Sequence, residues 1–153
     1  MVTRTRVRPD IVIQDRDGQP IAIVEIKNLS DLSEQVALEM LNNLRIHDLL
    51  ENIPFALVLS QEQGFIWKDL EPETGPVQPT ASFSMKEVVQ RHLPNLVNGD
   101  RVYKTTLELL VLGWLIGLTA IGDNIQSEPE TTLKETGFID AIEDAIVSTQ
   151  PSL

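Results

Sequence analysis

The chain has 153 residues, of which 42% are hydrophobic and 23% charged, as in a single folded domain rather than a disordered chain. It has no cysteine, which excludes disulfides, thiolate metal ligands and a cysteine nucleophile. The formal net charge of −11 argues against a protein that binds nucleic acid or an anionic membrane by bulk electrostatics. The first ten residues lack the apolar core of a secretory signal, so we expect a cytoplasmic protein.

The charge is uneven along the chain. Residues 1–27 have five basic and four acidic residues, whereas the remaining residues have seven basic and nineteen acidic ones. Arg4, Arg6 and Arg8 alternate, so in a strand their guanidinium groups would lie on one side. This arm is either a solvated edge that discourages aggregation or a segment that contacts phosphate groups.

The first predicted elements form a β-hairpin. β-Branched residues predict a strand over residues 10–14 and a second strand over residues 21–27. Asp17 and Gly18 between them are typical of a two-residue turn. The sequence therefore predicts two antiparallel strands joined by a tight loop.

A helix and a second pair of strands follow. Asp31 and Glu34 have the spacing of a capping box, which predicts a helix that continues to about residue 50 with one broad apolar face. Two further strands are predicted over residues 55–60 and 65–68, joined by a short turn.

A loop and three helices are predicted for the rest of the chain. Three prolines predict a loop or linker over residues 69–83. Helices are predicted over residues 85–92, 103–121 and 133–147. We therefore expect an α/β fold: a small mixed sheet flanked by helices in residues 1–68, and a helical part over residues 84–153 that packs on this core or on a dimer partner.

Two carboxylates and an amine gather on one side of the predicted hairpin. With a two-residue or four-residue loop, paired residue numbers add up to 35, so Asp10 lies opposite Glu25, whereas a three-residue loop would break this pairing. Lys27 lies on the same face, two residues beyond Glu25. Opposed like charges need a counter-charge, which Lys27 and a divalent cation, Mg²⁺ or Mn²⁺, would supply. The simpler alternative is a solvated strand face with a cross-strand ion pair.

The segment RPDIVIQDRDGQPIAIVEIKN resembles the core hairpin of the PD-(D/E)XK nuclease-like, or restriction-endonuclease-like, superfamily. The resemblance spans about residues 8–68. It implies that Asp10 and Glu25 hold Mg²⁺, with the main-chain carbonyl of Ile26 as a further ligand. It also implies that Lys27 assists the attack of water on a phosphodiester of DNA.

The same resemblance suggests accessory residues and a missing element. In some branches of the family the helix after the hairpin has a glutamine that faces the site, and Gln35 is the match here. Arg8, next to the motif, is a further accessory candidate. The family core begins with a helix and a strand ahead of the Pro-Asp pair. Only eight residues precede Pro9, so the core is trimmed, a partner subunit completes it, or residues 1–7 serve as the strand.

The long apolar helix points to a protein interface. Residues 109–122 are uncharged and include Gly113 and Gly117, whose spacing lets another helix approach closely. The run is too short to span a membrane, and a helix that is apolar all round is usually buried. It packs under the sheet or, as we expect, against a second copy of the chain through residues 107–121.

These observations favour a Mg²⁺-dependent endonuclease of the PD-(D/E)XK type that hydrolyses DNA. The alternative is a catalytically weak or inactive protein of this fold that acts as a dimeric interaction subunit. A third interpretation is a dimeric structural protein whose strand charges have no function. Metal binding separates the first two, because only the nuclease requires it.

Overall fold

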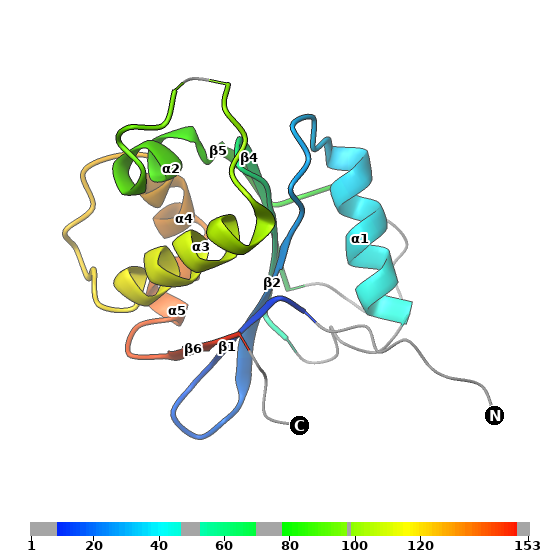
Figure 1. The fold of residues 1–153 in the computed structure, drawn as a ribbon. Coiled ribbons are helices and arrows are strands. Elements are labelled where there is room, and N and C mark those ends of the chain that lie inside the picture. Colours follow the sequence, from blue (N-terminus) through cyan, green and yellow to red (C-terminus); the bar gives the residue numbers. More distant parts are fainter. Residues whose placement is uncertain (1–8, 47–52, 70–77, 98, 150–153) are drawn as a thin grey trace.

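A computed structural model describes residues 9–46, 53–69, 78–97 and 99–149 (Figure 1). Its six strands form one mixed sheet in the order β5-β4-β3-β2-β1-β6, in which β2 and β3 are parallel and the other neighbours antiparallel. The strands are β1 Ile11–Gln14, β2 Pro20–Ile26, β3 Phe55–Leu59, β4 Gln63–Lys68, β5 Ala81–Ser84 and β6 Ile146–Ser148. The helices are α1 Glu34–Ile46, α2 Lys86–His92, α3 Lys104–Leu118, α4 Glu130–Glu135 and α5 Phe138–Ala141. The predicted α/β fold with a mixed sheet flanked by helices is confirmed.

The sheet separates two apolar layers. Figure 1 shows α1 on one face of the sheet and α2 to α5 on the other. α1 buries Ala37, Leu41 and Leu44 against one face. Leu107, Val111 and Leu115 of α3 belong to the larger cluster on the opposite face. Burial of these side chains is the main stabilising contribution, at about 25 cal/mol per Å² of apolar surface.

The hairpin turn differs from the prediction, although the strand register does not. The main-chain N–H of Asp15 donates to the carbonyl of Gln19 at 2.9 Å, so the loop has three residues rather than two. Gly18 occupies the left-handed region that closes such a loop, with φ of 85°. Ile21 is an extra, bulged residue, because Ile13 pairs with Ala22 while Gln14 pairs with Pro20. The bulge compensates for the three-residue loop, and the pairs beyond it add up to 35 as predicted.

The start of α1 is capped by Ser33, within the segment 30–34 that offers helix caps, and not by a capping box of Asp31 with Glu34. The hydroxyl of Ser33 accepts a hydrogen bond from the main-chain N–H of Val36 at 3.2 Å, and Glu34 begins the helix. Ser33 is therefore the N-cap, and the expected capping box of Asp31 with Glu34 does not form. Residues 47–50, the last turn of the predicted helix, lie outside the described residues.

The predicted loop over residues 69–83 is wrong at its end. Residues 81–84 form β5, which pairs antiparallel with β4 at the sheet edge. Only Phe83 of this strand is buried, so its composition gives little sign of a strand. Gly64 of β4 lies against Phe83, and a Cβ atom at Gly64 would come within 2.2 Å of its ring.

The single helix predicted over residues 133–147 is also wrong. α4 ends at Glu135, Gly137 takes a φ of 88°, and the short α5 follows. The left-handed glycine turns the chain between the two helices. The chain then forms β6, which pairs antiparallel with β1. β6 covers the edge of β1 that a strand ahead of Pro9 would take; residues 1–7 themselves lie outside the described residues.

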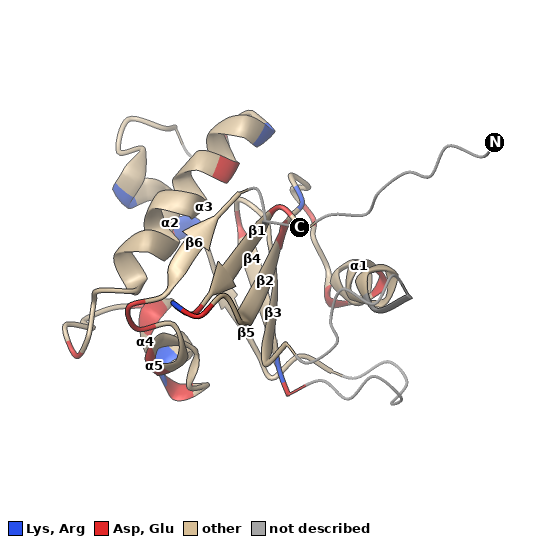
Figure 2. Cartoon of the chain, turned by 90° about the horizontal axis from the view of Figure 1, so that it is seen from below, with Lys and Arg blue, Asp and Glu red and all other residues tan. Residues whose placement is uncertain are grey.

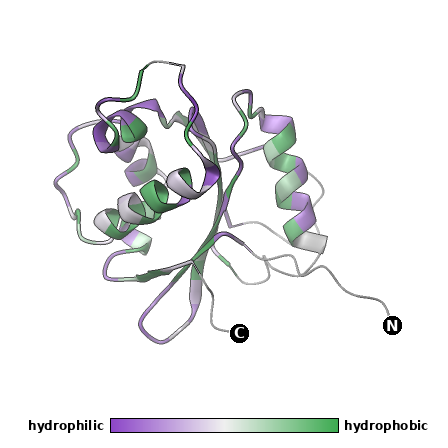
Figure 3. Cartoon of the chain, in the orientation of Figure 1, coloured by the Kyte–Doolittle hydropathy of each residue, from purple (hydrophilic) through white to green (hydrophobic). Residues whose placement is uncertain are grey.

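Charge and hydropathy follow this architecture. The strands are nearly free of charged residues, which lie mainly on helices and turns (Figure 2). Hydrophobic residues line the sheet and continue along α3 (Figure 3). Within the described ranges, no helix has the length and hydropathy needed to cross a membrane.

Candidate metal and phosphate site

The strand register places Asp10 opposite Glu25, as the sequence predicts. Ile11 pairs with Val24 and Val12 with Ile23, and the next pair in this register is Asp10 with Glu25. Both acidic residues lie on the face that α1 covers, because side chains alternate along a strand and Val12 and Ile23 pack on that face. The two carboxylates therefore meet where β1 begins and β2 approaches its end.

The two carboxylates have different partners. Oδ2 of Asp10 accepts a hydrogen bond from the main-chain N–H of Ile26 at 2.7 Å, which fixes its side chain across the hairpin. Oε1 of Glu25 is buried and has no hydrogen-bond partner among the described residues. A buried oxygen of this kind costs free energy unless a donor or a cation satisfies it. The site therefore presents one anchored carboxylate and one with an unsatisfied oxygen.

Burial and crowding perturb the charge of Glu25. Removal of its carboxyl group from water, reinforced by the negative charge of Asp10, raises the pKa of Glu25 from 4.5 to about 7. A main-chain hydrogen bond with Asp10 and the ammonium groups of Lys104 and Lys27 act in the opposite direction and lower this pKa. Burial and the charge of Asp10 thus outweigh the nearby ammonium groups in their effect on the pKa of Glu25.

Lys27 and Ile26 occupy the end of β2. Lys27 follows the last residue of the strand, and its main-chain N–H donates to the carbonyl of Leu59 at 2.8 Å. Its side chain is exposed, and its ammonium group is close enough to lower the pKa of Glu25. The structure thus brings Asp10, Glu25 and Lys27 together, with the main chain of Ile26 between them.

Of the two accessory candidates, Gln35 and Arg8, the structure describes only Gln35. Gln35 is exposed on the first turn of α1, and in the described part of the chain it makes no hydrogen bond to Asp10, Glu25 or Lys27. Arg8 lies outside the described residues.

A metal ion at this site would have few protein ligands. No cluster of three or more His, Cys, Asp or Glu side chains able to hold a metal occurs among the described residues. Asp10 and Glu25 would thus be its two carboxylate ligands, with water, a substrate phosphate and a main-chain carbonyl completing the shell. Mg²⁺ is commonly bound in this way, through one or two carboxylates and substrate oxygens.

A second group of residues, which sequence reasoning missed, holds the chain before α3 against this end of the sheet. Nε2 of Gln61 donates to the carbonyl of Asp100 at 2.6 Å, and the main-chain N–H of Val102 donates to Oε1 of Gln61 at 3.0 Å. Nδ2 of Asn28 donates to the carbonyl of Val102 at 2.8 Å. Arg101 donates to Asn28 at 2.7 Å and forms an ion pair with Glu62. We call Asn28, Gln61 and Arg101 the clamp.

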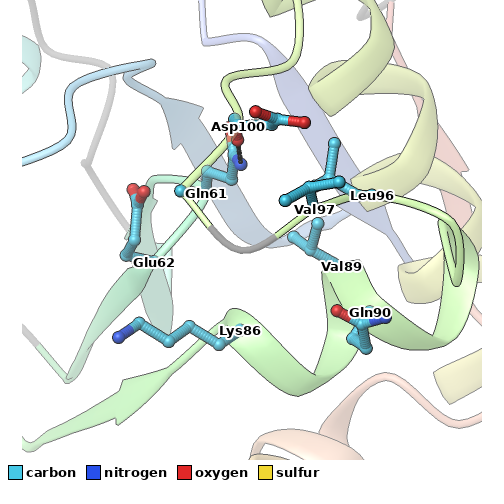
Figure 4. Close-up of a pocket in the computed structure, with 9 residues that line it drawn as sticks. Gln61, Glu62, Lys86, Val89, Gln90, Leu96, Val97 and Asp100 are labelled. Atoms are coloured by element: carbon cyan, nitrogen blue, oxygen red, sulfur yellow. Dashed lines mark hydrogen bonds between the residues drawn. The ribbon is translucent and has the colours of Figure 1, made fainter.

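Gln61 of the clamp also lines a cavity. Figure 4 shows Gln61, Glu62 and Asp100 on one side of a cavity of about 190 Å³ and Lys86 of α2 on another. None of Asp10, Glu25 and Lys27 lines it. The carboxylate pair is therefore a site at the end of the hairpin, outside this cavity.

Comparisons with family models, with curated proteins and with solved structures found no match for this chain.

Proposed function

We propose that this protein is a Mg²⁺- or Mn²⁺-dependent nuclease that hydrolyses phosphodiester bonds in DNA. The observation that supports it most is the opposed pair Asp10 and Glu25, in which a buried oxygen of Glu25 has no hydrogen-bond partner in the described part of the chain, with Lys27 beside it. The resemblance of these residues to the PD-(D/E)XK pattern gives the same assignment.

The residues present suit a hard divalent cation. Two carboxylates of combined charge −2 match Mg²⁺ or Mn²⁺, and oxygen ligands are those that such ions prefer. A cation there would satisfy Oε1 of Glu25 and offset both the burial of this carboxylate and the repulsion from Asp10, which together raise its pKa. When bound, the metal supplies polarisation of a phosphoryl oxygen and a more acidic water.

The protein groups then have separate roles. Asp10 is held by the N–H of Ile26, so it presents its second oxygen without a loss of side-chain order. Lys27, exposed at the end of β2, stabilises the negative charge that develops on the phosphate while the oxygen of water bonds to phosphorus and the ester P–O bond breaks.

A cleavage assay tests this function. Purified protein is incubated with supercoiled plasmid, linear duplex, single-stranded DNA and RNA in Mg²⁺ or Mn²⁺. We expect cleavage of at least one DNA form, a loss of at least about 10³-fold in Asp10→Ala and of about 10²-fold or more in Lys27→Ala. Asp17→Ala is the matched control, because Asp17 is an exposed aspartate in the same hairpin.

The outcomes are distinct. Activity that survives in Asp10→Ala would come from a contaminant or another site, and it would contradict the proposal. Binding of Mn²⁺ that is equal in wild type and Glu25→Ala would also contradict it.

The exposed face of α3 supports a second role, as a contact between two copies of the chain. Leu109 and Ile116 are 69% and 50% exposed, although both are large and apolar. Gly113 and Gly117 lie on the same stretch of helix, and a Cβ at either would meet nothing within 4 Å. The same surface thus has protruding side chains and hollows, which is what a two-fold symmetric contact requires. We infer a homodimer through α3.

Sedimentation velocity tests the dimer. We expect Ile116→Lys or Leu109→Lys to shift wild-type dimers to monomers, while Val97→Lys, at an apolar residue 67% exposed but outside α3, leaves them dimeric. Added salt should favour the dimer, because it screens repulsion between two chains of charge −11. A wild-type protein that stays monomeric at high concentration and in high salt would refute this contact.

A further inference from the structure

Lys27 is held in place by its main chain. Among the residues that the structure describes, its ammonium group forms no ion pair, so no charged side chain fixes it. Its main-chain N–H donates to the carbonyl of Leu59, and its carbonyl accepts from the N–H of Leu29, both at 2.8 Å. The position of the ammonium group relative to the carboxylate pair therefore depends on how firmly the end of β2 is held.

Asn28 binds this end of β2 to the opposite layer of the fold. Because side chains alternate along an extended chain, Lys27 lies on the face of the carboxylate pair, whereas Asn28 lies on that of Ile26, which packs in the same apolar cluster as α3. Nδ2 of Asn28 donates to the carbonyl of Val102 at 2.8 Å. Its Oδ1 accepts from Nη2 of Arg101 at 2.7 Å. A carbonyl only accepts and a guanidinium only donates, so these two bonds determine the orientation of the amide.

The partners of Asn28 are themselves fixed. The main-chain N–H of Val102 donates to Oε1 of Gln61 at 3.0 Å, and Nε2 of Gln61 donates to the carbonyl of Asp100 at 2.6 Å. Gln61 is only 6% exposed. Arg101 also forms an ion pair with the turn between β3 and β4. The side chain of Asn28 is therefore bound to a well-anchored segment that leads directly into α3.

We propose that Asn28 is a positioning residue, which holds Lys27 beside the carboxylate pair and makes the geometry of the site depend on the segment before α3. This inference rests on the proposed nuclease function and assigns a residue outside the Pro-Asp and Glu-x-Lys pattern. A group that stabilises developing charge must be placed closely, since a shift of about 1 Å can cost roughly 10²-fold in rate. Without its two side-chain hydrogen bonds the end of β2 moves more freely, and the ammonium group of Lys27 moves with it.

A double-mutant cycle in the cleavage assay tests this role. We expect Asn28→Ala to lower kcat by about tenfold and to leave KM within about twofold, because Lys27 acts on charge that develops only in the transition state. In the Lys27→Ala background the same substitution should cause no further loss, since no ammonium group is left to position. A general loss of structure would instead lower kcat equally in both backgrounds.

A second variant and a matched control sharpen the test. Asn28→Asp keeps the shape and the acceptor for Arg101 but cannot donate to the carbonyl of Val102, and it should lower kcat by about threefold or more. Asn28→Ala should bind Mn²⁺ as wild type does, because Asp10 and Glu25 are unchanged. Asn124→Ala removes an exposed asparagine side chain and should keep the wild-type kcat.

The outcomes separate this role from the nuclease function itself. Wild-type kcat in Asn28→Ala and Asn28→Asp, in a protein that cleaves DNA, would overturn the positioning role alone. An equal tenfold loss in the Lys27→Ala background would also overturn it, because the effect would then not pass through Lys27. Failure of wild type to cleave any nucleic acid would refute the nuclease function and this role with it.

Discussion

Glu25→Gln is expected to make the metal-free protein more stable at pH 8, by about 2–3 kcal/mol in the free energy of unfolding. The pKa of Glu25 is about 7 in the folded protein against 4.5 for a free glutamate, which corresponds to roughly 3 kcal/mol when the group is fully ionised. Water screens part of this free-energy cost, because the side chain of Glu25 is only partly buried. Glutamine has the same shape and no charge, so the repulsion from Asp10 disappears.

The sign of the pH dependence follows from the raised pKa. Below pH 4.5 Glu25 is protonated in both the folded and the unfolded state, and this group does not destabilise the fold. Between pH 4.5 and 7 the folded state binds more protons, so wild-type stability falls as the pH rises. Urea unfolding at pH 4.5, 6 and 8 should show this decline for wild type and a flatter profile for Glu25→Gln.

Two controls make this result specific. Glu39→Gln changes an exposed glutamate on α1 and should behave as wild type at every pH. Mn²⁺ should raise the stability of wild type at pH 8 but not that of Glu25→Gln, since only wild type can bind the ion through both carboxylates. A Glu25→Gln protein that is less stable than wild type at pH 8 would show that the carboxylate is already compensated.

Arg91→Met is expected to destabilise the protein by about 2–4 kcal/mol, because it leaves the buried carboxylate of Glu130 without its cation. Glu130 is 3% exposed. Its Oε2 accepts from Nη2 of Arg91 and from Nε1 of Trp114, both at 2.8 Å. This network joins α2, α3 and α4, so its loss affects the packing of all three helices.

A second substitution distinguishes charge from shape. Glu130→Gln combined with Arg91→Met should recover most of the lost stability, because an uncharged amide oxygen can still accept from Trp114. Chemical unfolding of the single and double variants measures this coupling. Arg16→Met, at an exposed arginine of the hairpin loop, should change stability by no more than about 0.5 kcal/mol. No recovery in the double variant would show that Arg91 contributes through packing alone.

Local pattern explains most of what the sequence predicts correctly. Asp10, Glu25 and Lys27 are brought together by a single hairpin, so alternation and the register of two adjacent strands are sufficient to place them. The register is as predicted although the turn is not, because the bulge at Ile21 offsets the three-residue loop. The loop length alone would have given the wrong pairing.

The structural features that could not be predicted from the sequence depend mainly on tertiary contacts. Asn28 and Val102 are 74 positions apart, so the clamp has no local signal in the sequence. β5 is a strand because β4 offers an edge to it, and its own residues favour no strand strongly. The break between α4 and α5 has a local cause, since Gly137 adopts a left-handed conformation, but glycine within a helical pattern is also compatible with an unbroken helix.

The pairing of β6 with β1 has a consequence for how the chain is made. The first and last described strands are neighbours, so during synthesis the outer edge of β1 stays open until β6 has left the ribosome. An unpaired edge can join the edges of other nascent chains. The sheet therefore reaches its protected form only after β6 has been synthesised and has paired with β1.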